Sequence, residues 1–223
     1  MNLCRYVGRK TCGFLVFFLS LAAVGPLSAQ QRRPGSLEIP GLTVPDAPKN
    51  LKPFARYIYD KKYKLHFHVP EGWRSESRDG VLSNFGVDTR TTRRGLQVRG
   101  VAAIDYNPYP PTTFSGALFY YSVLPTATAA QCSAQTTSRG LKPQSSVSIN
   151  GRLFYHGRDQ HGVGCIESRV DAFTTMRRSS CLRFDLVVNT FCSQTSGAME
   201  ITPKQLEDIE GRLTGMLASV TFE

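Results

Sequence analysis

Apolar and polar residues alternate along several stretches of this chain, a pattern that predicts β-strands with one buried face. The alternation is clearest over Tyr63–Val69, where the odd-numbered positions are apolar and the even-numbered positions are polar. The aromatic run Tyr57–Tyr59 comes just before it, and a short charged segment separates the two runs. This arrangement predicts a hairpin. The next segment, Val69–Gly72, has proline second and glycine fourth, which fits a type I turn.

Five further segments also predict strands. Ala117–Leu124 is apolar on both faces, so we expect it to be covered on both sides and to lie centrally in its sheet. Met176–Ser179 predicts the turn between the last two strands, and such a turn favours cross-strand ion pairs such as Arg169 with Asp185. The five segments are Leu96–Asp105, Ala117–Leu124, Gly151–Arg158, Gly164–Thr174 and Ser180–Thr190.

Two segments carry helix signals. Thr126–Gln135 is rich in alanine and predicts a short helix that begins at Thr126. Thr202 is a good N-cap, Pro203 suits the first helical position and Gln205 completes a capping box, so a second helix begins there. Its apolar residues recur at helical spacing, which predicts that the helix packs on a sheet. They are Leu206, Ile209, Leu213, Met216, Leu217 and Val220.

The N-terminus has the order of a Sec-type signal peptide. Three basic residues precede the apolar run Phe14–Val24, and the small residues of Leu27–Ala29 follow it. We expect cleavage after Ala29 and a protein that is secreted or periplasmic. The apolar run is shorter than the roughly 20 residues that a membrane span needs, so we expect no span after cleavage. A retained signal anchor is the alternative.

Composition divides the remaining chain in two. Residues 30–50 hold four prolines and predict a flexible Pro/Gly-rich linker, whereas residues 51–223 are long enough for a single domain.

Cleavage removes three basic residues and no acid, so the formal net charge falls from +10 to +7. Basic clusters at Lys61–Lys64 and Arg90–Arg99 form either a solvated surface or a contact with an anionic envelope or lipid surface. No nucleic-acid-binding motif accompanies them, so we expect no nucleic-acid partner.

Cleavage also removes two cysteines and leaves four, an even number that predicts two disulfides in an exported protein. Four cysteines allow three pairings. A turn centred near Arg178 places residues opposite each other when their numbers sum to about 357, which favours Cys165 with Cys192. That choice leaves Cys132 to pair with Cys181.

The segment Tyr63–Trp73, a strand followed by Pro-x-Gly-Trp, resembles the early hairpin of the PsbP-like superfamily. The C-terminal helix, which runs into Leu217–Phe222, is similar to the end of that family. The resemblance covers the two ends of the domain. It implies an α+β fold in which helices, including the C-terminal helix, pack on the faces of an antiparallel β-sheet. Because members of the family are mostly binding or assembly factors, it also implies a non-catalytic protein.

Four histidines are the candidates for a metal site. His66 and His68 lie two apart on a strand and so project from one face. His156 and His161 lie in or beside a segment that is bounded by glycines and predicts a loop. If that loop folds over the early hairpin, three histidine nitrogens and the carboxylate of Asp159, which lies in the same loop, converge on zinc or copper. The alternative is that they are ordinary histidines on the polar faces of strands.

The sequence holds neither a G-x-S-x-G nor an S-x-x-K nucleophile motif. The acids Glu167, Asp171 and Asp185 lie among Arg169 and Arg183, so we interpret them as salt-bridged strand residues. We therefore expect an exported, non-catalytic binding or accessory protein of the periplasm or cell envelope, without a cofactor. Its partner would be an unknown protein or envelope component. The alternative is a metal-binding protein or metal-dependent enzyme that uses the histidine cluster.

Overall fold

The computed structural model describes residues 56–91, 95–104 and 106–223. All of them belong to one compact unit, Leu37–Glu223. The predicted signal peptide (1–29), the predicted linker (30–50) and the first five residues of the predicted domain lie outside the described residues. Within the described ranges, no helix combines the length and the apolar character that a membrane crossing requires.

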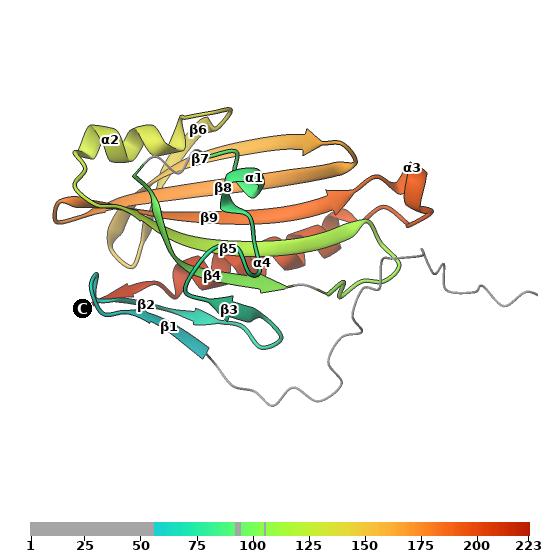
Figure 1. Cartoon of the computed structure of the whole chain (residues 1–223), viewed down its shortest axis with the longest axis horizontal. Helices are drawn as coiled ribbons and strands as arrows, with labels where there is room; N and C mark the ends of the chain where they lie inside the picture. Colours follow the sequence, from blue (N-terminus) through green and yellow to red (C-terminus); the bar gives the residue numbers. More distant parts are fainter. Residues whose placement is uncertain (1–55, 92–94, 105) are drawn as a thin grey trace, which may run out of the picture. The chain divides into compact units, whose positions relative to one another are not determined.

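Seven strands form the larger sheet, in the order β3-β4-β5-β9-β8-β7-β6, and every neighbouring pair is antiparallel (Figure 1). The prediction that Ala117–Leu124 lies inside a sheet is confirmed, because this segment belongs to β5. The short strand β3 and the mostly exposed strand β6 were not predicted, since neither shows apolar alternation. The strands are β3 (Arg74–Glu76), β4 (Gln97–Ile104), β5 (Phe114–Leu124), β6 (Lys142–Ile149), β7 (Arg152–Val163), β8 (Ile166–Arg177) and β9 (Ser180–Phe191).

A second sheet of three strands has the order β1-β2-β10. The predicted hairpin is present as β1 (Arg56–Asp60) and β2 (Leu65–Val69), and β10 (Thr221–Phe222) pairs with β2. The turn after β2 lies one residue later than predicted, because Trp73 donates its backbone N–H to the Pro70 carbonyl (3.3 Å). Glycine is therefore third in the turn, at a φ of 82° that other residues rarely adopt.

The C-terminal helix α4 (Pro203–Ala218) begins as predicted, with the Thr202 N-cap and the Gln205 capping box both formed. The alanine-rich segment forms a shorter helix than expected. Its N-cap is Thr128, and α2 (Ala129–Ser133) runs into a turn of 3-10 helix, η1 (Ala134–Thr136). Two further helices in the described residues are single turns, α1 (Phe85–Asp88) and α3 (Ser193–Ser196).

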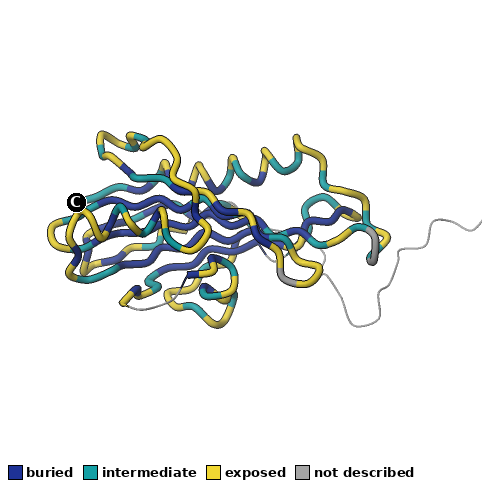
Figure 2. Tube along the Cα trace, turned by 90° about the horizontal axis from the view of Figure 1, so that it is seen from above, coloured by how far each residue is buried: buried dark blue, intermediate teal, exposed yellow. Residues whose placement is uncertain are grey.

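The two faces of the larger sheet carry separate cores. On one face, residues such as Phe119 and Phe184 pack with α4 and with the inner face of the smaller sheet. On the other face, Tyr120 and Val187 pack with Phe85 of α1, and α2 contacts β8 and β9. The buried residues follow the strands (dark blue in Figure 2). The α+β class, with antiparallel strands and helices on the faces, is confirmed.

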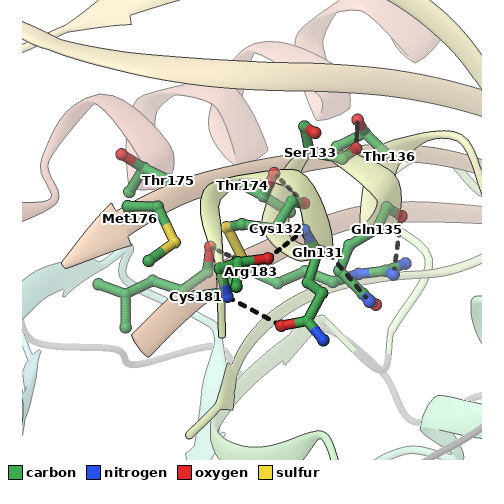
Figure 3. The surroundings of a disulfide bond; sticks show 12 residues. Gln131, Cys132, Ser133, Gln135, Thr136, Thr174, Thr175, Met176, Cys181 and Arg183 are labelled. Atoms are coloured by element: carbon green, nitrogen blue, oxygen red, sulfur yellow. Dashed lines mark hydrogen bonds between the residues drawn. A yellow bond between two sulfur atoms is a disulfide. The ribbon is translucent and has the colours of Figure 1, made fainter. Parts of the chain in front are cut away.

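The pairing of β8 with β9 sets the positions of the cysteines. A two-residue turn joins the strands and places Arg177 opposite Ser180 at one end and Ile166 opposite Phe191 at the other. Cys165 and Cys192 follow in the same register and are bonded, with their Cα atoms 5.2 Å apart. The second disulfide joins Cys132 of α2 to Cys181 of β9 and holds α2 on the sheet (Figure 3). The first is the pair that the turn position favoured, and the second is the pair that this choice left.

The same register shows that the predicted ion pair between Arg169 and Asp185 is wrong. Arg169 lies opposite Val188, and Asp185 lies opposite Ala172. Ala172 is three residues from Arg169, so strand alternation places the two charged side chains on opposite faces of the sheet. Arg169 instead pairs with Glu167, and Asp185 pairs with Arg183.

Candidate binding groove

The helix α4 leaves part of one face of the larger sheet open. It contacts mainly β9, β5 and β2. A hollow of about 870 Å³ lies between the start of α4 and the ends of β7, β8 and β9, and a smaller one of about 90 Å³ lies further along the helix. Arg169 lines both, and we call them together the α4 groove. Its lining is Thr113, His156, Arg158, Gln160, His161, Gly162, Gly164, Cys165, Ile166, Glu167, Arg169, Asp171, Phe173, Leu186, Val188, Thr190, Phe191, Cys192, Glu200, Ile201, Pro203, Leu206, Glu210, Leu213 and Thr214.

Polar side chains of β7 and β8 form the floor of the groove. Arg158 lies opposite Asp171 and Gln160 lies opposite Arg169, so alternation places all four on one face. The Gln160 amide and the Arg169 guanidinium both donate to Oε1 of Glu167, at 2.6 and 3.2 Å. These contacts hold charges of both signs in fixed positions along the floor.

Asp171 is the centre of a hydrogen-bond network that lines the smaller hollow. Arg158 donates to both of its carboxylate oxygens, at 2.8 and 3.1 Å, and His156 Nε2 lies 2.6 Å from Oδ1. The His156 ring in turn stacks on Phe173, with a centroid distance of 4.2 Å. Burial by itself raises the pKa of Asp171, but the hydrogen bonds from His156 and Arg158 outweigh burial and lower the pKa below its ordinary value. Asp171 is thus a stable anion.

Replacing Asp171 with Asn tests this arrangement. At pH 7 we expect the free energy of unfolding to fall by about 1.5–3 kcal/mol, because hydrogen bonds between charged groups are lost. The pKa of Asp171 is lower in the folded protein than its ordinary value of 3.8. The carboxylate therefore stabilises the fold fully above pH 3.8, and this stabilisation is lost as the pH falls through the lowered pKa. Urea unfolding at pH 7 and at about pH 2.5 measures both effects. If the free energies of unfolding of wild type and variant differed equally at the two pH values, the stabilising role of the Asp171 anion would be contradicted.

The rim and wall of the groove are more apolar than its floor. Ile166 is half exposed (50%) at the end of β8, and Phe191, Ile201 and Leu206 line the same hollow. The Cys165–Cys192 disulfide joins the strand ends at this rim. The groove therefore combines apolar surface with fixed charges, which is the usual composition of a binding site.

The structure does not bring the four candidate metal histidines together. His66 and His68 lie on β2 of the smaller sheet, whereas His156 and His161 lie on β7 of the larger one. The predicted glycine-bounded loop is in fact the second half of β7, and residues five apart on a strand point to opposite faces. In the parts of the chain that are described, no group of three potential ligands lies close enough to hold a metal ion.

Each histidine has other neighbours. His66 Nε2 lies 2.8 Å from the Thr221 hydroxyl, and the Tyr57 ring contacts both His66 and His68. His161 Nδ1 lies 3.0 Å from a carboxylate oxygen of Asp159. Only His156 contributes its ring to the floor network of the groove.

The sequence pattern indicated that Glu167, Arg169 and Asp171 are paired strand residues, but it did not single out Arg158 or Gln160. The available signal was the polar alternation on β7, which continues past Arg158 to Gln160. The glycines on either side concealed it, because glycine is typical of loops.

No protein-family model matches the chain. No curated protein matches it either.

Several solved structures are similar to this chain. Cyanobacterial PsbP (CyanoP) from Synechocystis sp. PCC 6803 is 13% identical, with a TM-score of 0.41 over 82% of this chain and 99% of that one. LpqN of Mycobacterium tuberculosis, involved in cell envelope biogenesis, is 9% identical, with a TM-score of 0.41 over 75% and 90%. The Ran-binding protein Mog1p of Saccharomyces cerevisiae is 8% identical, with a TM-score of 0.40 over 76% and 96%. The family that the sequence resemblance named is thus represented among these structures.

Proposed function

We propose that this chain is an exported, non-catalytic binding or accessory protein of the periplasm or cell envelope, and that the α4 groove holds its partner. The observation that carries the proposal is the groove itself. It is large enough, at about 870 Å³ in its main part, to receive several side chains of a partner. The N-terminal pattern of basic residues, apolar run and small residues supports export.

The charges of the groove support binding rather than catalysis. Asp171 is held by Arg158 and His156, and Glu167 is held by Arg169. A general acid or base needs a pKa near the working pH, whereas these contacts hold Asp171 as an anion. The four cysteines in the described ranges are all bonded in disulfides and cannot act as nucleophiles.

The composition of the groove indicates the chemistry of its partner. An apolar rim next to fixed charges of both signs fits a polypeptide segment that carries an apolar anchor and polar or charged side chains. Arg169 lies where the two hollows meet, so we expect it to contact such a segment.

Photo-crosslinking in the producing cells tests the proposal. A photoreactive residue at Ile166, on the rim, should give a discrete cross-linked product from the extracytoplasmic fraction, and Arg169→Ala should reduce that product several-fold. The cross-linked chain should begin at Gln30. The control position is Glu207, on the exposed side of α4 away from the groove. Equal products from both positions, or a product only in the cytoplasm, would contradict the proposal.

A further inference from the structure

A cluster of basic side chains lies at the end of the unit that holds the C-terminus. The β1–β2 turn carries Lys61, Lys62 and Lys64, and the β8–β9 turn carries Arg178 directly after Arg177. Figure 1 shows the C-terminus beside the β1–β2 turn. With Arg152, at the start of β7, these six residues form what we call the basic end.

Hydrogen bonds and cation–π contacts join the parts of the basic end. The backbone N–H of Glu223 donates to the Lys64 carbonyl (2.9 Å), and Arg177 donates to the main-chain oxygen of Glu223. Two guanidinium groups lie over the Phe222 ring, that of Arg152 at 4.2 Å and that of Arg177 at 5.1 Å from its centroid. Segments that are far apart in the sequence therefore present their cations on one surface.

The cations at this end outnumber the acids that lie among them. Of the acids that lie among these residues, Asp60 is buried and paired with Arg99, and Glu223 pairs with His66 (3.8 Å). Burial, followed by the charges of Arg152 and Arg178, lowers the pKa of the Arg177 guanidinium. Among the described residues, no ion pair joins an acid to the exposed cations, which are Lys61, Lys62, Lys64 and Arg178.

Two exposed tyrosines lie next to the basic end. Tyr57 and Tyr59 are on the outer face of β1, with 64% and 47% of their surface exposed. The Tyr59 hydroxyl donates to the Glu223 carboxylate (3.0 Å), which places its ring beside the cations. Aromatic side chains with a polar tip are typical of surfaces that meet the headgroup region of a bilayer.

We propose that the basic end is a docking surface for an anionic phospholipid leaflet. The cations come from separate turns and spread over a surface, and none of them lines the α4 groove. Such a distribution matches the many phosphate groups of a leaflet better than one bound phosphate. The surface would hold the protein at a membrane while the groove stays free for its partner.

Flotation with lipid vesicles tests the proposal, using protein purified from the producing cells with its N-terminus determined by mass spectrometry. Vesicles of phosphatidylcholine with about 30% phosphatidylglycerol should bind the protein at about 50 mM salt and release it at about 500 mM, since salt screens surface charges. Each cation near an anionic leaflet raises partitioning about five-fold. The triple variant Lys61→Gln, Lys64→Gln, Arg178→Gln should therefore partition about 100-fold less.

The matched control neutralises three exposed cations from other elements: Arg78→Gln, Lys142→Gln and Lys204→Gln. It changes the net charge equally and should lower partitioning less than ten-fold. Circular dichroism must show that both variants are folded. An equal loss in the two variants, no binding to the anionic vesicles, or complete release by millimolar glycerol phosphate would overturn the proposal. Because the basic end and the groove share no residue, Arg169→Ala should lower vesicle binding no more than a single substitution of the control set does.

Discussion

Replacing Gly157 with Ala should lower the free energy of unfolding by about 3 kcal/mol, the upper end of the usual cost of overpacking. A Cβ atom at this position would lie 1.9 Å from the carbonyl oxygen of Thr136, which no real contact permits. The neighbour is backbone, so a side-chain rotation cannot relieve the clash. Either η1 or β7 must move.

The η1 segment cannot easily retreat from β7. The Cys132–Cys181 disulfide holds the preceding helix on the sheet, and the Thr174 hydroxyl donates to the Cys132 carbonyl (3.0 Å). Arg183 donates to the Gln135 carbonyl (3.1 Å), one residue before Thr136 (Figure 3). The clash is therefore opposed by several contacts at once.

The control is the same substitution at Gly211. Urea unfolding at pH 7 measures the free energy of unfolding of both variants. Gly211 lies on the exposed side of α4 with no atom within 4 Å of an added Cβ. Alanine there should stabilise the protein by up to about 1 kcal/mol, because alanine is the better helix former. If Gly157→Ala also proved neutral or stabilising, the close approach of η1 to β7 would be wrong.

Breaking the Arg183–Asp185 pair should have a comparable or larger effect. Both side chains are completely buried, and Arg183 donates to both carboxylate oxygens at 2.7–3.0 Å. It also donates to the Thr91 hydroxyl (3.0 Å). Asp185→Leu or Arg183→Met should each cost about 3–5 kcal/mol in urea unfolding, because each leaves a buried charge without its partner.

A double-mutant cycle separates the interaction energy of the two side chains from the other effects of each single substitution. The double variant Arg183→Met, Asp185→Leu should cost much less than the sum of the single changes, since it leaves no buried charge. Arg212→Met supplies a matched control, because Arg212 pairs with Asp208 on the exposed side of α4 and should contribute less than about 1 kcal/mol. Single variants at Arg183 and Asp185 that cost as little as Arg212→Met would contradict this account.

Features that depend on neighbours in the sequence were predicted well. The β1–β2 hairpin followed from an aromatic run and an alternating run on the two sides of a short charged turn. The start of α4 followed from Thr202, Pro203 and Gln205, whose capping contacts involve only the first helical turn. The two-residue turn between β8 and β9 sets the register of twelve-residue strands, so its position also led to the observed pairing of Cys165 with Cys192.

Several features that depend on distant segments were not predicted. The exposed strand β6 has no apolar face, and β7 continues through glycines because it pairs with β8 along its length. Gly157 looked like a loop residue, but it is a strand residue that η1 approaches closely. The α4 groove exists because the helix covers β9 and β5 while β7 and β8 extend past it.

The sequence by itself determined the strands with strong alternation, the C-terminal helix, the cysteine pairing that the turn favours and the acids that end in ion pairs. These features rest on the two-residue period of strands and on local capping, which act between neighbours. Only the tertiary structure decided which face of the sheet each charge occupies and what covers it. It separated Arg169 from Asp185, separated the histidines, and brought the lysines of one turn to the arginines of another. Such relations depend on how distant segments cross and pair, because the sequence pattern of a strand specifies its alternation and not its neighbours.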